Sequence, residues 1–143
     1  MARAKDYDFK KVLVTIGSYS LGGYGSDGGI EVAWGGVWMT KDVGADGEVT
    51  YSQGNDDSTS VTITLRESSR SYRDLMTLAR EQRAREGAIQ PLAFLMRDLV
   101  NGDELKDRYC VFMEIPDMSK AATAGDRVFV LDLPNARANA KFG

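Results

Sequence analysis

The chain contains no histidine, and this absence limits the chemistry that its 143 residues can perform. Without histidine there is no Ser-His-Asp or Cys-His pair for nucleophilic catalysis, and no zinc site of the usual kinds. There is one cysteine, Cys110, so no internal disulfide can form. It lies within an apolar run, which predicts a buried and inert thiol.

Long apolar runs and a basic surplus are also missing. No apolar run is long enough to cross a bilayer, and the first residues carry no apolar segment of the signal-peptide kind. We therefore expect no membrane anchor and no secretion by a signal peptide. The chain has 18 Lys and Arg against 21 Asp and Glu, a net charge of −3. Proteins that bind nucleic acids through phosphates normally carry a basic patch or balance, which this composition does not show.

Alternating apolar and polar residues predict a mainly β protein, and the length of the chain suits one domain spanning residues 1–143. We expect about seven strands. They cover residues 9–19, 30–40, 48–53, 58–65, 91–100, 105–115 and 127–133. Gly35-Gly36, inside the second segment, indicates a bulge or a close backbone approach. Residues 41–47 and 54–57 are predicted turns, and Asn101-Gly102 is a strong hairpin signal.

One segment has helical periodicity. Leu75, Leu78 and Ala79 fall on one apolar stripe, and Gly87 is a natural stop, so an amphipathic helix is predicted over residues 72–86. Ser71 and Asp74 fit a capping box with Ser71 as the N-cap. A single helix cannot cover both faces of the predicted sheet. The expected fold is therefore a β-sandwich or barrel with the helix flanking one side or end.

Two segments are expected to be loosely held. Residues 21–29 are dense in glycine and predict a flexible loop, and residues 134–143 are poor in apolar side chains. The loop matches the G-x-G-x-x-G pattern of dinucleotide-binding sites. Such a loop must open a helix, however, and the residues that follow it predict a strand, so we expect no nucleotide cofactor.

The remaining polar clusters carry no catalytic signature. The acidic turns lack EF-hand spacing, which favours solvated turns over a calcium site. A carboxylate pair serves glycosidases without histidine, and Trp34 and Trp38 offer surfaces on which a sugar could stack. No pair stands out by its spacing, so we predict no enzyme and no catalytic, metal-binding or cofactor-binding residue. A carbohydrate-binding module or a histidine-free glycosidase stays open as the alternative class.

The segments follow a characteristic order. The turn and strand ADGEVTYSQGNDDS precede the strand STSVTITL and the helix SYRDLMTLAREQ; a hairpin and then FMEIPDMSKAATAGDRVFVLDL follow. With the opening YDFKKVLVTIGSYSLGGYGSDGGIEVAW, this order resembles bacteriophage tail tube proteins, especially those of contractile-tailed phages. The resemblance covers about residues 7–133.

The resemblance implies a structural virion protein related in fold to the tube proteins of bacteriocins and type VI secretion. In that family, hexameric rings stack into a hollow tube whose strands join around the lumen, and DNA passes through without specific binding. It also implies tail sheath, baseplate and tail terminator proteins as partners, and assembly in the host cytoplasm. A terminator or baseplate hub protein of the same fold is the alternative within this class.

Three groups of residues have expected roles in such a tube. An acidic lumen would repel the DNA backbone and let it slide. The expected lumen lining is Glu31, Asp98 and Glu114. Strand alternation alone fits the outer surface equally well, so that surface is the alternative place for these residues. The expected inter-ring contact loop contains Leu21, Gly23, Tyr24, Gly25 and Asp27. The expected sheath-facing residues of the helix are Arg73, Arg80 and Arg83.

Overall fold

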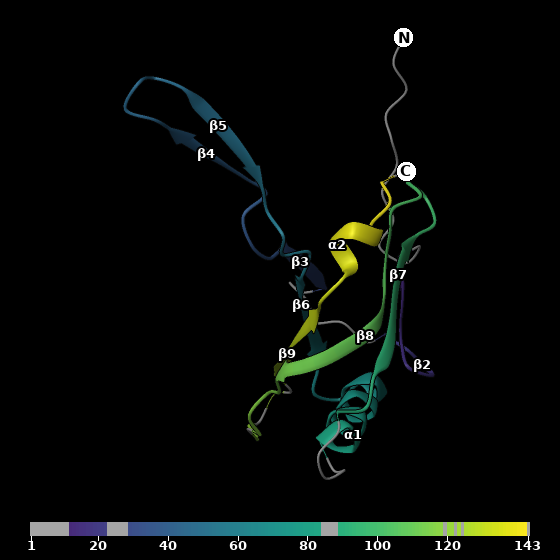
Figure 1. The fold of residues 1–143 in the computed structure, drawn as a ribbon. Helices are drawn as coiled ribbons and strands as arrows, with labels where there is room; N and C mark the ends of the chain where they lie inside the picture. The colour runs from purple at the N-terminus through teal and green to yellow at the C-terminus, as the bar shows by residue number, and fades with distance from the viewer. Residues whose placement is uncertain are drawn as a thin grey trace.

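The computed structural model describes residues 12–22, 29–83, 89–118, 120–121, 123 and 125–142, and these form nine strands and two helices (Figure 1). The elements are β1 Val12–Ile16, β2 Tyr19–Ser20, β3 Ile30–Trp34, β4 Met39–Val43, β5 Val49–Gln53, β6 Thr59–Arg66, α1 Arg70–Arg83, β7 Leu92–Asp98, β8 Glu104–Glu114, β9 Asp126–Leu133 and α2 Ala136–Asn139. Within these residues, neither helix has the length and apolar character needed to span a membrane.

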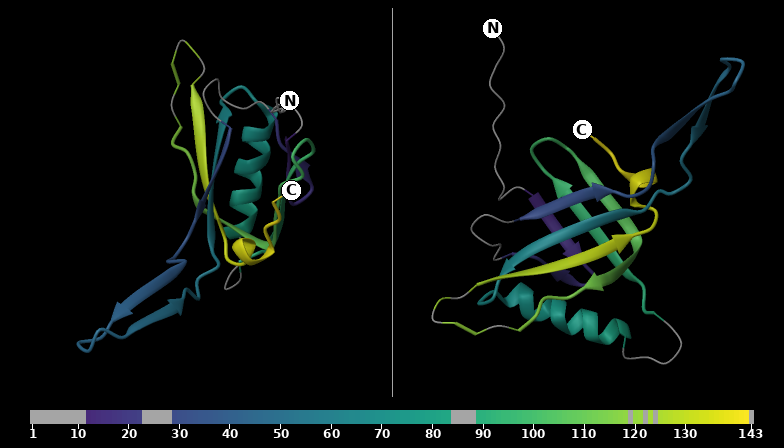
Figure 2. Two further views of the ribbon diagram at one scale, coloured as in Figure 1. Left: turned by 90° about the horizontal axis from the view of Figure 1, so that it is seen from above. Right: turned by 90° about the vertical axis from the view of Figure 1, so that its left-hand side faces the viewer.

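Seven strands form an antiparallel sheet in the order β2-β1-β7-β8-β9-β6-β3. The long strand β8 belongs to both halves of this sheet, because its first part pairs with β7 and its last part with β9. A register shift between Leu92 and Phe94 marks the place where β8 changes partner, and such bulges bend a strand. The sheet therefore folds over on itself into two layers with α1 across one end (Figure 2). This arrangement confirms the predicted sandwich with one main flanking helix.

The core lies between the two layers. On β6, Val61, Ile63 and Leu65 are fully buried, and they alternate with half-buried hydroxyl side chains on the opposite face. Phe129 of β9 and Leu75 of α1 are fully buried in the same cluster. Cys110 is also fully buried, and this burial raises the pKa of its thiol to about 12. The predicted burial of this thiol is thereby confirmed, and the raised pKa disfavours the reactive thiolate.

Helix α1 buries the predicted apolar stripe, but its N-cap differs from the prediction. The amide of Tyr72 donates to the hydroxyl of Ser69 at 3.2 Å, so Ser69 caps the helix. Ser71 lies inside the helix on its buried side, where its hydroxyl accepts a hydrogen bond from the Gly22 amide at 2.9 Å. The predicted N-cap at Ser71 is wrong because this tertiary partner takes the hydroxyl. The helix is predicted to extend to residue 86, but residues 84–86 lie outside the described residues.

The predicted strand over residues 30–40 is confirmed for Ile30–Trp34, which form β3, but it is wrong beyond them because the chain leaves the sheet at Gly35. Gly36 has a φ of +71°, and a Cβ atom at Gly35 would lie 2.5 Å from the Ser58 hydroxyl, so the predicted close backbone approach at this pair is confirmed. Beyond it, β4 and β5 form a separate hairpin that projects from the body (Figures 1 and 2). The predicted turn over 41–47 shrinks to 44–48, since β4 extends to Val43. We call residues 37–54 the arm.

The C-terminal segment returns to the sheet. Ala136 of α2 is fully buried, and Glu104 and Lys141 exchange two backbone hydrogen bonds of 2.8 and 2.9 Å. The low apolar content of residues 134–143 predicts a loosely held tail and gives no indication of these contacts.

Candidate assembly surfaces

The layer β8-β9-β6-β3 turns one face away from the core, and two of the predicted lumen residues lie on it. Glu31 pairs with Thr62, Thr62 pairs with Val130, and Val130 pairs with Glu114. Cross-strand partners point to the same side of a sheet, so Glu31 and Glu114 share a face. Both side chains are exposed. The structure therefore places on one face two carboxylates that are far apart in the sequence.

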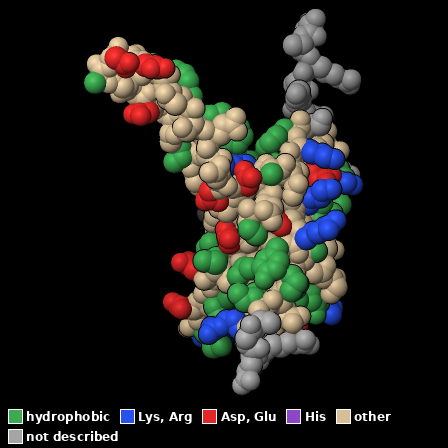
Figure 3. All heavy atoms as spheres, viewed as in Figure 1, with side chains coloured by type: hydrophobic (Ala, Val, Ile, Leu, Met, Phe, Trp, Pro, Cys, Tyr) green, Lys and Arg blue, Asp and Glu red, His purple; other side chains and the backbone are tan. Residues whose placement is uncertain are grey.

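The rest of this face is rich in hydroxyl and acidic side chains. We call it the acidic face. Its outward residues are Glu31, Ala33, Ser60, Thr62, Thr64, Arg66, Val111, Glu114, Asp126, Val128, Val130 and Asp132. Its one basic residue, Arg66, pairs in register with Asp126. In Figure 3, acidic side chains lie along the left of the body, whereas most of the visible Lys and Arg lie on the right.

Asp132 is a member of the acidic face that was not proposed from the sequence. In β9, Val128, Val130 and Asp132 alternate with buried residues, and this alternation indicates that Asp132 points outward. Partial burial raises the pKa of the Asp132 carboxyl, and the nearby negative charges of Asp56 and Asp107 raise it further.

Asp98, the third predicted lumen residue, does not lie on the acidic face. It ends β7 in the other layer, at the start of a turn. Its carboxylate accepts hydrogen bonds from the amides of Val100 at 2.9 Å and Asn101 at 3.2 Å, and these bonds lower its pKa. The geometry of Asp98 is that of a turn-stabilising residue. Gly102, in the same turn, has a φ of +81°, as the Asn-Gly hairpin signal predicts.

Every residue of the two arm strands is exposed, and the two faces of the hairpin differ in character. One face carries Met39, Lys41, Val43, Val49, Tyr51 and Gln53, and the other carries Thr40, Asp42, Thr50 and Ser52. Tyr51 is 69% exposed and Val43 is 56% exposed. An isolated two-stranded hairpin is only marginally stable in water, and apolar surface gains free energy when it is covered. Covering the apolar face would therefore stabilise the arm.

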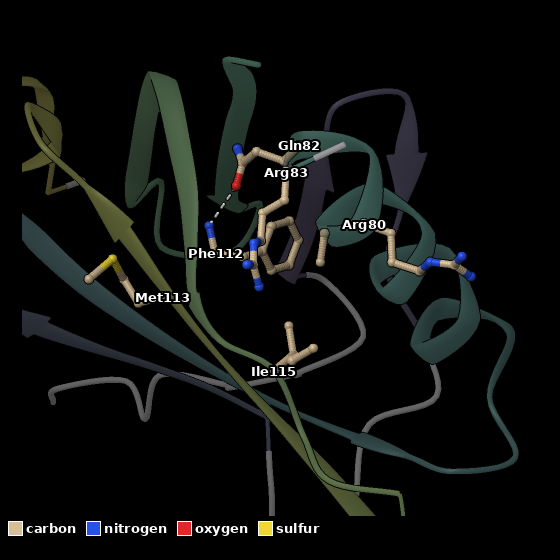
Figure 4. Close-up of a pocket in the computed structure, with 7 residues that line it drawn as sticks. Arg80, Gln82, Arg83, Phe112, Met113 and Ile115 are labelled. Carbon is tan, nitrogen blue, oxygen red and sulfur yellow. Dashed lines mark hydrogen bonds between the residues drawn. The ribbon is translucent and has the colours of Figure 1, made fainter. Parts of the chain in front are cut away.

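The three predicted sheath-facing arginines are exposed on α1. Arg80 and Arg83 line a hollow with Phe112, Met113 and Ile115. In Figure 4, Arg83 extends toward Phe112, whereas Arg80 points away from it. Between them, buried Gln82 donates to the Cys110 carbonyl at 2.7 Å and accepts from the Phe112 amide at 2.9 Å. Gln82 thus fixes the end of α1 to β8 near the point where β8 passes from one layer to the other.

The other predicted sites are placed only in part. Leu21 is half-buried, packs against the core and donates its amide to the Val14 carbonyl at 2.9 Å. The remaining predicted inter-ring residues, Gly23, Tyr24, Gly25 and Asp27, lie outside the described residues. Among the residues that the structure does describe, there is no group of three acidic or Cys side chains placed to hold a metal ion.

Three comparisons relate this chain to known proteins. A family model described as bacteriophage PhiTE tail tube protein matches residues 5–137. No curated protein matches the sequence. Several solved structures share the fold at low sequence identity. A chain from a native gene transfer agent virion is 11% identical with a TM-score of 0.65, over 96% of this chain and 99% of that one.

Two further solved structures come from assembled injection machines. The tube-terminating cap of the anti-feeding prophage is 8% identical with a TM-score of 0.61, over 100% of this chain and 94% of that one. The sheath/tube terminator of the extracellular contractile injection system PVC, in its extended state, is 9% identical with a TM-score of 0.59, over 92% and 95%. At these identities, the likeness establishes a shared fold.

Proposed function

The chain belongs to the bacteriophage PhiTE tail tube protein family, and on that premise we propose that it polymerises as stacked hexameric rings into the tail tube. The family is structural, and its members are components of the phage tail rather than enzymes. In our proposal, subunits assemble in the host cytoplasm, and phage DNA later passes through the lumen during ejection. Tail sheath, baseplate and tail terminator proteins are the further partners.

The acidic face is the observation that carries this proposal, as the lining of the lumen. Besides its hydroxyl side chains, the acidic face has four carboxylates and only one basic residue, Arg66. A surface of this kind has no cluster of cations to hold phosphates, and its charge repels the DNA backbone. Such a lining suits a conduit, because tight binding of the cargo would slow its passage.

The edges of the same layer support closure into a ring. β3 is an edge strand, and the end of β8, from Val111 to Glu114, pairs with β9 on one side. Within the described residues, no strand covers the outer edge of either segment, although on the β8 edge the Phe112 amide already donates to Gln82 of α1. Open edges present unpaired N–H and C=O groups that readily accept another strand. Pairing β3 of one subunit with the end of β8 of the next would continue the sheet around the lumen.

The arm supplies a second contact between subunits. Its apolar face is exposed in the single chain, and its tip carries Asp46 and Glu48. Figure 3 shows acidic side chains at this tip. In a stack of rings, a neighbouring subunit would cover the apolar face. The loop around Leu21 would contact the adjacent ring. With the acidic face inward, α1 and its Arg73, Arg80 and Arg83 would lie outside, toward the sheath.

Electron microscopy of the purified chain tests the proposal. Rings and tubes should form as the protein concentration rises, and the tubes should have sixfold symmetry. A chain that stays monomeric at high concentration, in buffers where its fold is intact, would overturn the proposal.

A terminator of the same tube is a second candidate, favoured by one observation: two of the similar structures are a tube cap and a sheath/tube terminator. Copy number separates the two functions. A tube subunit should be among the most abundant proteins of the particle, whereas a terminator should be present only at one end.

A further inference from the structure

The arm joins the body through two short connections, residues 35–38 and 54–58. They lie close together: the Gly54 amide donates to the Trp38 carbonyl at 3.0 Å, and the Gly35 amide donates to the Ser58 carbonyl at 2.8 Å. A Cβ atom at Gly54 would collide with the Val37 carbonyl. Glycine therefore permits this approach, but it does not by itself fix the direction in which the arm points.

One side chain from the other end of the sequence bridges both connections. The Arg137 guanidinium donates through Nη1 to the Gly35 carbonyl at 2.8 Å and through Nη2 to the Asp56 carbonyl. Its Cζ atom lies 5.0 Å from the centre of the Trp38 ring, within cation–π range. Only 6% of the Arg137 side chain is exposed. The planar, always charged fork of arginine suits two carbonyls held at fixed positions.

The segment that carries Arg137 is itself anchored to the body. The Asn135 amide donates to the buried carboxylate of Asp107 on β8 at 2.7 Å, and Ala136 is fully buried. Farther on, Phe142 packs edge-to-face on Trp34, with 6.0 Å between the ring centres. The backbone at Arg137 is thus held by β8 and α2, and its amide also donates to the Asp57 carbonyl of the second connection at 3.1 Å.

From these contacts we infer that Arg137 is a positioning residue for assembly: it clamps the base of the arm and sets its direction before a neighbouring subunit is met. This inference rests on the proposed function. An arm that is held in its docking direction loses less freedom on binding than an arm that swings. Without the clamp, the backbone bonds of β4 and β5 remain, so the hairpin stays formed, and its direction then depends only on the backbone bonds at the two connections.

The two tryptophans of the chain, Trp34 and Trp38, both belong to this cluster, so tryptophan fluorescence, excited selectively over the six tyrosines, reports on the arm base. The variants are Arg137→Ala and Arg137→Lys, and Arg108→Ala, at an exposed arginine of β8, is the matched control. In dilute monomer, Arg137→Ala should increase quenching of tryptophan by acrylamide and speed hydrogen exchange in residues 39–53. Protection of the buried Cys110 thiol should be unchanged, which shows that the body remains folded.

Tube formation gives the second readout. Arg137→Ala should raise the protein concentration needed for tubes by about tenfold or more, since it removes charge-assisted hydrogen bonds. Arg137→Lys keeps the charge but lacks the planar guanidinium. It should fold like the parent, and the concentration that it needs for tubes should lie between those of the parent and Arg137→Ala. If both Arg137 variants match the parent in acrylamide quenching, in hydrogen exchange of residues 39–53 and in tube formation, the inference that Arg137 clamps the arm is overturned. If the unaltered chain forms no tubes, the proposed function fails, while the fluorescence and exchange results still decide whether Arg137 holds the arm.

Discussion

Glu31 and Glu114 lie in one cross-strand row at the two edges of the same layer, joined through Thr62 and Val130. If β3 of one subunit pairs with the end of β8 of the next, Glu114 of each subunit comes close to Glu31 of its neighbour. A ring built in this way would carry a belt of carboxylates on its inner wall. That arrangement connects the row in the single chain to the passage of DNA through the assembled tube.

Reversing the charge of this row should make the tube retain DNA. In tubes of the double variant Glu31→Lys and Glu114→Lys, a short duplex should co-sediment at low salt and be protected from nuclease, because lysines hold phosphates. The control is Glu81→Lys, on the exposed side of α1. Any duplex that these control tubes bind should lie outside the lumen, where nuclease can digest it. Equal protection in both kinds of tube, or none in the double variant, would argue against an inward acidic face.

The two faces of the arm should differ in their importance for assembly. Tyr51→Glu places a charge on the apolar face and should abolish tube formation, because burying an unpaired charge at a contact is costly. Thr50→Glu places the same charge one residue away on the polar face and should largely spare assembly. Both variants should melt like the parent, since both positions are exposed. Assembly and melting can be followed by light scattering and circular dichroism, and equal loss of assembly would contradict docking through the apolar face.

Asp132 should make stability depend on pH. Because its pKa is raised in the folded chain, the folded state binds the proton more tightly than the unfolded state, and the Asp132 contribution falls as pH rises. Asp132→Asn should therefore raise the melting temperature at neutral pH, and the gain should vanish below the ordinary carboxyl pKa of about 3.9. Asp126→Asn, at the exposed end of the same strand, is the control and should give no gain. A gain that persists in acid would contradict the electrostatic cause.

The Cys110 thiol should be unreactive in the folded chain. With a pKa of about 12, only about one thiol in ten thousand is ionised at pH 8, and the side chain is fully buried. An aromatic disulfide reagent should therefore label Cys110 at the rate of unfolding and react at once in denaturant. Fast labelling under native conditions would contradict the packing of β8 against the core.

Alternation along single strands predicted much of this fold. In β6, Val61, Ile63 and Leu65 point inward and the hydroxyl residues point outward. One face of the strand packs against the core and the other meets solvent, so apolar and polar residues alternate in the sequence. The placement of Glu31 and Glu114 on outward positions followed from the same pattern, but their common row depends on registers that no local pattern contains.

The arm and its clamp escaped prediction for a different reason. The run from Ile30 to Thr40 is apolar enough for one strand, and only the packing of Ser58 and Asp56 against Gly35 and Gly36 shows that the chain turns out of the sheet. Arg137 stands in a segment with few apolar residues, and its partners are distant in sequence. The same kind of long-range hydrogen bond moved the N-cap of α1 from Ser71 to Ser69.

A reconstruction of the assembled tube by electron cryomicroscopy tests the central claim most directly. The account predicts rings of six subunits in which β3 of each subunit pairs with the end of β8 of the next, so that Glu31, Glu114 and Asp132 face the lumen. A tube whose lumen is lined instead by the β2-β1-β7-β8 layer, or a chain that forms no tube, would contradict it.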